Sequence, residues 1–100
     1  GGMRKRAALA RAMALNPEIL FLDEPTAGMS PEETRAMQSL IGDLPADLTV
    51  VIIEHDMDVV FGLAERVTVL DYGTILLEGT PAEVRASDVV RQRYLGGGTP

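Results

Sequence analysis

The stretch "ILFLDEPTAGMS", residues 19–30, joins four apolar residues directly to two adjacent carboxylates. A short, continuous apolar run such as Ile19–Leu22 predicts a strand that is buried on both faces, as in a parallel sheet covered by helices. Asp23 and Glu24 then lie where this strand ends, and Pro25 begins a turn. The stretch therefore decides the fold class and also marks a candidate site.

Helix signals lie on both sides of this strand. Upstream, residues 3–15 are rich in Ala, Leu, Met and Arg, and Asn16 followed by Pro17 ends the predicted helix. Downstream, Ser30 is a predicted N-cap, because a proline and then a glutamate follow it at the favoured positions. This second helix is predicted to end near residue 43.

The remainder of the chain continues the alternation of strands and helices. The predicted elements are a buried strand at 48–53, a helix at 56–64, a hairpin of strands at 67–70 and 74–78, and helices from Thr80 and over 87–95. This order predicts an α/β fold with a mostly parallel sheet and flanking helices. Ligands bind at the carboxyl ends of such strands, so we expect Glu54-His55-Asp56 to share an edge with Asp23-Glu24.

Charge and composition exclude several classes of protein. The net charge is -6, and four of the nine basic residues lie within the first eleven residues. One basic helix is too small a footprint for nucleic acid, so we predict no nucleic-acid partner and a solvated helix face for Arg4 and Lys5. The absence of cysteine excludes a disulfide framework. No apolar run approaches the ~18 residues of a membrane span.

The two carboxylates suit phosphate chemistry. Asp23 could hold Mg²⁺ directly or through water, because this ion takes hard oxygen ligands. Glu24 could orient and polarise a water for attack on a phosphate, since phosphoryl transfer requires mainly positioning and charge compensation. The alternative is a pair of exposed acids that start a turn.

Two further features suit the same chemistry. His55 is the only histidine, and a neutral imidazole at a strand end could bind a terminal phosphate or the attacking water. The alternative is an ordinary ion pair with its flanking acids. Gly1-Gly2 precede a helix, whose N-terminus can bind an anion that approaches the bare backbone. The alternative there is a simple turn.

Together these motifs resemble the ATP-binding cassette (ABC) ATPases. Residues 1–12 resemble the signature motif and the helix after it, and residues 19–26 resemble the Walker B strand. Residues 27–30 occupy the position of the D-loop. Residues 51–56 resemble the switch-histidine strand, and residues 71–81 resemble the hairpin beyond it. It implies that residues 1–95 form the C-terminal portion of a P-loop NTPase domain, a partial nucleotide-binding domain. The run Gly96-Gly97-Gly98 itself predicts that residues 96–100 form a flexible tail.

The resemblance also implies roles for single residues. Asp23 would help to hold Mg²⁺, Glu24 would be the catalytic carboxylate, and His55 would contact the γ-phosphate of ATP. Gly1 and Gly2 would meet the ATP held by a second nucleotide-binding domain, because these domains work as head-to-tail pairs. The sequence departs from the family at Met3, which replaces the signature Gln, and at Ser30, which replaces the D-loop Asp of many relatives.

Within the family, residues 25–31 and 54–61 resemble ATPases of branched-chain amino acid importers. This resemblance implies an ATP-hydrolysing, energy-coupling subunit on the cytoplasmic face of the cell membrane. Its partners would be transmembrane permease subunits and, indirectly, a substrate-binding protein. The alternatives are a soluble ABC ATPase of DNA repair or translation and a truncated, non-enzymatic product.

The 100 residues contain no Walker A loop, whose lysine reaches the β- and γ-phosphates. We therefore expect the chain to begin within a longer protein. By itself, we expect it neither to bind ATP tightly nor to hydrolyse it.

Overall fold

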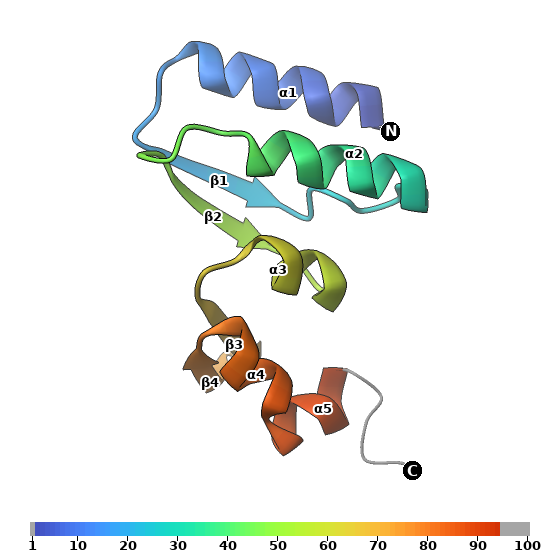
Figure 1. Ribbon diagram of the computed structural model, residues 1–100, viewed down its shortest axis with the longest axis vertical. Coiled ribbons are helices and arrows are strands. Elements are labelled where there is room, and N and C mark those ends of the chain that lie inside the picture. The colour runs from blue at the N-terminus through green and yellow to red at the C-terminus, as the bar shows by residue number, and fades with distance from the viewer. Residues whose placement is uncertain (1, 95–100) are drawn as a thin grey trace. The chain divides into compact units, whose positions relative to one another are not determined.

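The computed structural model describes residues 2–94 (Figure 1). The elements are α1 Gly2–Ala14, β1 Ile19–Asp23, α2 Pro31–Gly42, β2 Thr49–Ile53, α3 Met57–Leu63, β3 Val67–Asp71, β4 Thr74–Gly79, α4 Pro81–Ala86 and α5 Asp88–Tyr94. Each predicted helix and strand is present. Gly1 and the predicted tail, 96–100, lie outside the described residues. Within the described part, no helix has the length and apolar character needed to cross a membrane.

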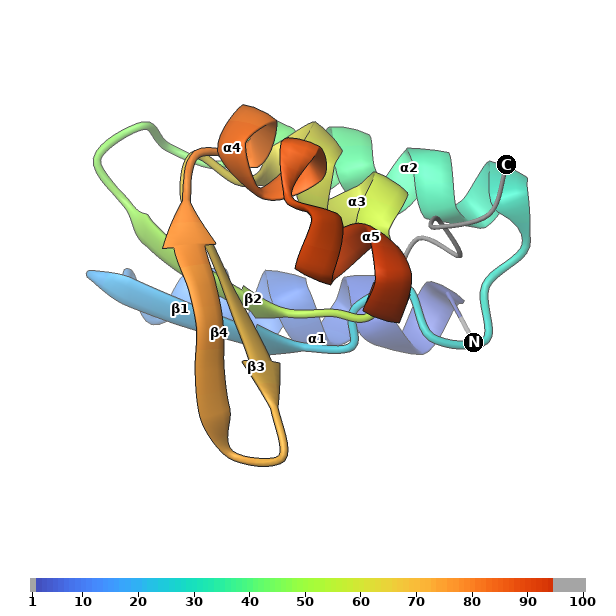
Figure 2. The same cartoon turned by 90° about the horizontal axis from the view of Figure 1, so that it is seen from below.

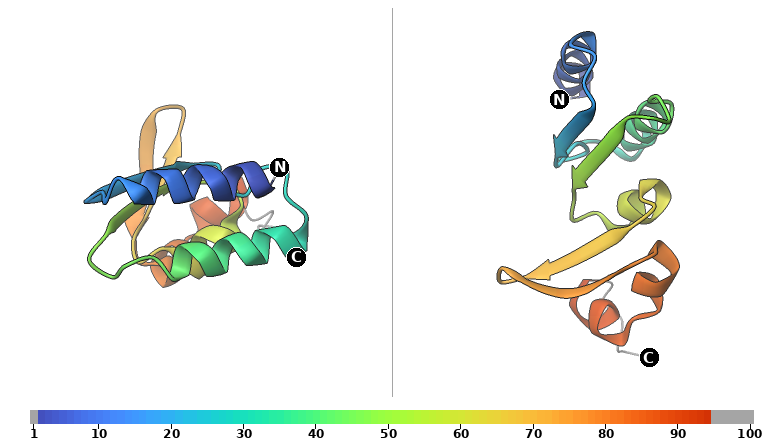
Figure 3. Two further views of the ribbon diagram at one scale, coloured as in Figure 1. Left: turned by 90° about the horizontal axis from the view of Figure 1, so that it is seen from above. Right: turned by 90° about the vertical axis from the view of Figure 1, so that its left-hand side faces the viewer.

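The chain divides into two compact units, Gly1–His55 and Asp56–Pro100. The first is built on a parallel ladder in which Leu20 pairs with Val50 and Asp23 pairs with Ile53. Helices α1 and α2 lie on one face of this ladder (Figure 3). The core of this unit contains Leu9, Leu20, Met37 and Ile41.

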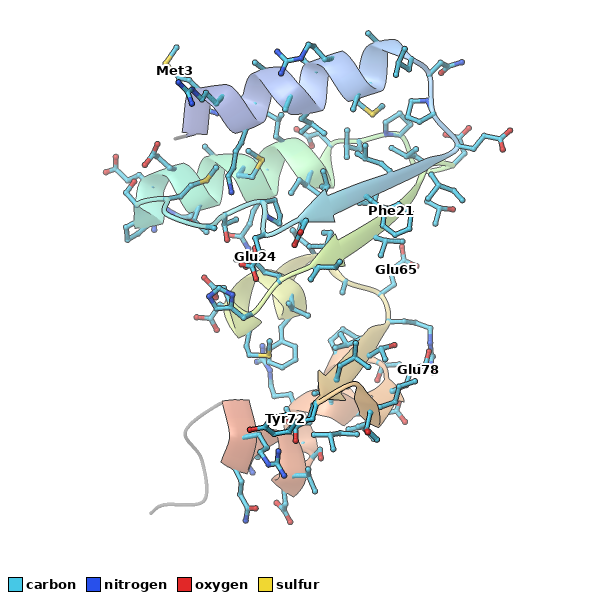
Figure 4. The ribbon with its side chains drawn as sticks, turned by 180° about the vertical axis from the view of Figure 1, so that it is seen from behind. Met3, Phe21, Glu24, Glu65, Tyr72 and Glu78 are labelled. Carbon is cyan, nitrogen blue, oxygen red and sulfur yellow. The ribbon has the colours of Figure 1, made fainter. Side chains whose placement is uncertain are left out.

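The other face of the β1–β2 ladder is open. Apolar side chains on the two strands alternate between the helix-covered face and this one, where the exposed residues are Ile19, Phe21, Val51 and Ile53. Phe21 is 68% exposed, and Figure 4 shows it on the face turned away from the helices. The prediction that both strands are buried on both faces is therefore wrong within this unit, because the described helices cover only one face.

Helix α2 begins as the sequence predicted. The Ser30 hydroxyl accepts a hydrogen bond from Glu33 N at 3.2 Å, and Glu33 Oε1 accepts one from Ser30 N at 3.1 Å. Pro31 occupies the first turn. The same capping box opens α4 at Thr80. These reciprocal bonds satisfy backbone N–H groups that have no partner within the helix, which fixes where each helix starts.

The second unit is an antiparallel pair, β3 and β4, packed with short helices (Figure 2). Tyr72 and Gly73 both have positive φ angles, 50° and 76°, as a two-residue hairpin turn of the favoured type requires. The buried core of this unit consists of Val67, Val69, Val84 and Val90. With one parallel ladder, one hairpin and flanking helices, the α/β class predicted from the sequence is confirmed.

Candidate functional site

The polar clusters after β1 and β2 meet at one edge, as predicted. Because the strands are parallel and Asp23 pairs with Ile53, the next residues along each strand, Glu24 and Glu54, lie side by side. Glu24 N donates to the carbonyl of Ile53 at 2.7 Å and extends the ladder by one bond. Figure 4 shows Glu24 just beyond the tip of β1.

Glu24 and His55 are in direct contact. His55 Nδ1 lies 2.9 Å from Glu24 Oε1 and 2.9 Å from Oε2. The hydrogen bond is made to Oε1, while Oε2 is shielded from solvent and has no hydrogen-bond partner among the described residues. Oε2 lies at the same distance from the ring nitrogen as Oε1, and its further lone pair can accept from an incoming water or bind a cation.

The contact with Glu24 also constrains the histidine ring. If Nδ1 carries the proton that bridges to Glu24, then Nε2 is an acceptor in the neutral ring and a donor only in the imidazolium form. The His55 side chain is 78% exposed. Because Nε2 donates only in the imidazolium form, the protonation state of His55 decides whether this atom can donate to a phosphate.

Glu54 ties the end of β2 to the loop that follows β1. Its Oε2 accepts from Thr26 Oγ1 at 2.8 Å and from Thr26 N at 3.4 Å, and its Oε1 accepts from His55 N at 3.3 Å. Thr26 is only 7% exposed. A role for Glu54 itself was not predicted from the sequence, although its place directly after a strand, beside His55, was the signal available.

Lys5 of α1 reaches the same loop. Its Nζ donates to the Glu24 carbonyl at 2.6 Å, in a half-buried setting. The prediction of a solvated helix face is therefore wrong for Lys5, because a backbone acceptor lies within reach of its side chain. For Arg4 the prediction is consistent with an exposed side chain.

The carboxylates supply only part of a magnesium site. Ligand atoms of Glu24, Glu54 and His55 lie within 4.8 Å of one another, and the two carboxylates fit Mg²⁺ better than the imidazole does, since Mg²⁺ takes oxygen ligands. Asp23 is exposed and outside this group; it continues the strand alternation of Ile19 and Phe21. Its role as a magnesium ligand stays a prediction.

The remaining predicted residues lie at the starts of the two helices. Gly2 is buried at the start of α1, where a Cβ atom would come within 2.8 Å of Glu33 Oε2. The pKa of Glu33 is lowered, chiefly by the hydrogen bond from the Ser30 backbone and to a smaller extent by that from Gly2. The start of α1 thus already faces a carboxylate oxygen, as an anion-binding helix terminus does. Ser30 is engaged as the N-cap of α2.

Known proteins are similar to this chain in sequence and in fold. Residues 1–27 match the family described as "ABC transporter". The high-affinity branched-chain amino acid transport ATP-binding protein LivG of Salmonella typhimurium is 44% identical over 97 residues, which cover 95% of this chain and 38% of that protein. The chain thus spans well under half the length of this relative.

Two solved structures have the same fold. The cbiO1 protein from Clostridium perfringens, part of the ABC transporter complex cbiONQ, is 33% identical with a TM-score of 0.78, over 95% of this chain and 40% of that one. The dimeric, post-hydrolysis ATP-binding cassette MJ0796, bound to ADP and Pi, is 32% identical with a TM-score of 0.70, over 80% of this chain and 35% of that one.

In sequence and in fold, the chain is therefore similar to part of the proteins of the ATP-binding cassette family. Within that family it is similar, over almost all its length, to the ATP-binding proteins of branched-chain amino acid transport.

Proposed function

We propose that this chain is the catalytic-carboxylate part of an ATP-hydrolysing subunit that drives an importer of branched-chain or other amino acids. The observation that carries the proposal is the Glu24 carboxylate at the carboxyl edge of the β1–β2 ladder. His55 Nδ1 lies 2.9 Å from both carboxylate oxygens and is hydrogen-bonded to Oε1, while Oε2 is shielded from solvent and makes no hydrogen bond among the described residues. The similarity to the branched-chain transport proteins supports the cargo class.

In this proposal Glu24 Oε2 accepts a hydrogen bond from the water that attacks the γ-phosphate of ATP. The bond orients the water and polarises it, which is the positioning that phosphoryl transfer requires. The contact with His55 Nδ1 limits the rotation of the carboxylate. In its imidazolium form the same ring can also donate from Nε2 to a phosphate oxygen.

The other predicted residues bind rather than react. Asp23 would help to hold Mg²⁺ through water, and the bound ion would neutralise charge on the phosphates. Gly1 and Gly2 would meet the ATP of a second cassette through the start of α1, with Ser30 in the adjoining loop. The dimeric form of MJ0796 supports the paired arrangement.

The proposed partners are those of a membrane transporter. The presence of cbiO1 in a transporter complex supports transmembrane permease subunits as partners, with a substrate-binding protein acting through them. The subunit would then lie peripherally on the cytoplasmic face of the cell membrane.

The test is Glu24→Gln in the complete protein that carries this chain. Gln keeps the size of the side chain but is a much weaker base, so turnover should fall by at least about 10²-fold. ATP binding should persist, and dimers should accumulate on ATP.

The control is Glu18→Gln, the same change at the exposed residue that precedes β1 at its opposite end. It should leave turnover unchanged. Wild-type turnover in Glu24→Gln, or an equal loss in Glu18→Gln, would refute the catalytic assignment.

A further inference from the structure

Glu24 has a strained backbone. Its φ angle is +52°, in the left-handed region that non-glycine residues rarely adopt. Such a conformation is unfavourable for an L-residue and persists only where the surrounding contacts enforce it. The contacts that hold Glu24 therefore also decide where its carboxylate lies.

Hydrogen bonds fix Glu24 at both of its backbone polar groups. Its N–H donates to the Ile53 carbonyl at 2.7 Å, and its carbonyl accepts from Ala27 N at 3.1 Å. These two bonds belong to the ladder and to the turn. The third bond, from Lys5 Nζ at 2.6 Å, comes from a different element, helix α1.

The hydrogen bond from Lys5 differs from the other two in its length, its charge and its surroundings. It is the shortest of the three, it is charge-assisted, and it lies in a half-buried setting where such bonds are stronger than in water. The ion pairs found among residues 2–94 do not involve Lys5. Its ammonium group is therefore directed to a carbonyl rather than to a neighbouring acid.

We propose that Lys5 is a positioning residue for Glu24, an inference that rests on the proposed function. Lys5 holds the Glu24 carbonyl, which keeps the residue left-handed and its carboxylate against His55. Because Lys5 lies one helical turn from Gly2, it also links the start of α1 to the catalytic carboxylate. A nucleotide that engages α1 would then act on Glu24 through this bond.

The test is Lys5→Met in the complete protein, because Met keeps the unbranched stem and removes the donor. A small displacement of a reacting group costs up to about 10²-fold in rate, so we expect kcat to fall roughly 10- to 100-fold with little change in the KM for ATP. Lys5→Arg, which restores a cationic donor, should recover part of the loss. The melting temperature of each variant checks that it folds.

Two further variants separate positioning from a general effect of charge or stability. Arg35→Met removes an exposed positive charge from α2 and should leave kcat unchanged. In a Glu24→Gln background, Lys5→Met should lower the residual rate no further, because the group that it positions is already disabled.

The outcomes are distinguishable from those of the main proposal. If Glu24→Gln abolishes turnover but Lys5→Met behaves like Arg35→Met, the role of Lys5 is refuted and the catalytic assignment stands. If Lys5→Met lowers the rate equally in both backgrounds, the loss does not act through Glu24 and the inference also fails. If Glu24→Gln has no effect, the proposed function itself fails.

Discussion

The bond between Thr26 and Glu54 gives a stability prediction whose size follows from the structure. Thr26→Val replaces the hydroxyl by a methyl group of similar volume, so it removes the 2.8 Å bond without opening a cavity. Glu54 Oε2 then keeps only the 3.4 Å contact from Thr26 N. A hydrogen bond to a charged group contributes about 1.5–3 kcal/mol, and a half-buried acceptor favours the lower end. We expect the free energy of unfolding to fall by about 1.5 kcal/mol.

The assay is urea unfolding of the complete protein, followed by circular dichroism, with the midpoint and the slope fitted separately. The slope should not change, because the same surface is exposed on unfolding. Thr26→Ser, which keeps the hydroxyl, should lose less than Thr26→Val. Thr68→Val makes the same chemical change at an exposed strand position and serves as the control. If Thr26→Val lies within about 0.5 kcal/mol of wild type, the bond does not stabilise the loop.

Two other predictions concern the core and the helix caps. Met37 is 2% exposed and Met3 is 85% exposed. Met37→Ala should therefore lower the free energy of unfolding by about 2–5 kcal/mol, while Met3→Ala should change it little. Equal losses of the two variants in urea unfolding would contradict the packing. The pKa of Glu83 is lowered below its ordinary 4.5, chiefly by the Thr80 backbone N–H; its contribution to stability is therefore present above that value and lost as the pH falls through the lowered pKa. Glu83→Gln should make the fall of the melting temperature with acid shallower, and an unchanged slope would contradict it.

The elements were predictable because local signals agreed with one another. Ser30 and Thr80 each precede a proline and a glutamate at cap spacing, and both capping boxes are present. Tyr72-Gly73 between two apolar runs predicted the hairpin, and the positive φ angles confirm it. Such signals depend on a few neighbouring residues, so the sequence alone carries them.

Burial and long-range contacts were less predictable. The apolar run Ile19–Leu22 indicates a strand, but which elements cover its faces depends on residues far along the chain. Lysine is a residue type expected at a solvated helix position. Only the fold brings the Glu24 carbonyl, nineteen residues away, within reach of Lys5. Glu54 likewise acts through Thr26, at a separation of 28 residues.

The adjacent acids Asp23 and Glu24 show where sequence reasoning about this site ends. The parallel register makes it predictable that both lie at the carboxyl edge, because Asp23 pairs with Ile53. Asp23 still follows the alternation of the strand and is exposed, whereas Glu24 leaves it through a positive φ angle and reaches His55. No pattern of side chains in the sequence predicts that the φ angle of Glu24 is positive. It is set by bonds to the backbone of Glu24, so the position of the proposed catalytic carboxylate depends on residues that do no chemistry themselves, with Lys5 among them.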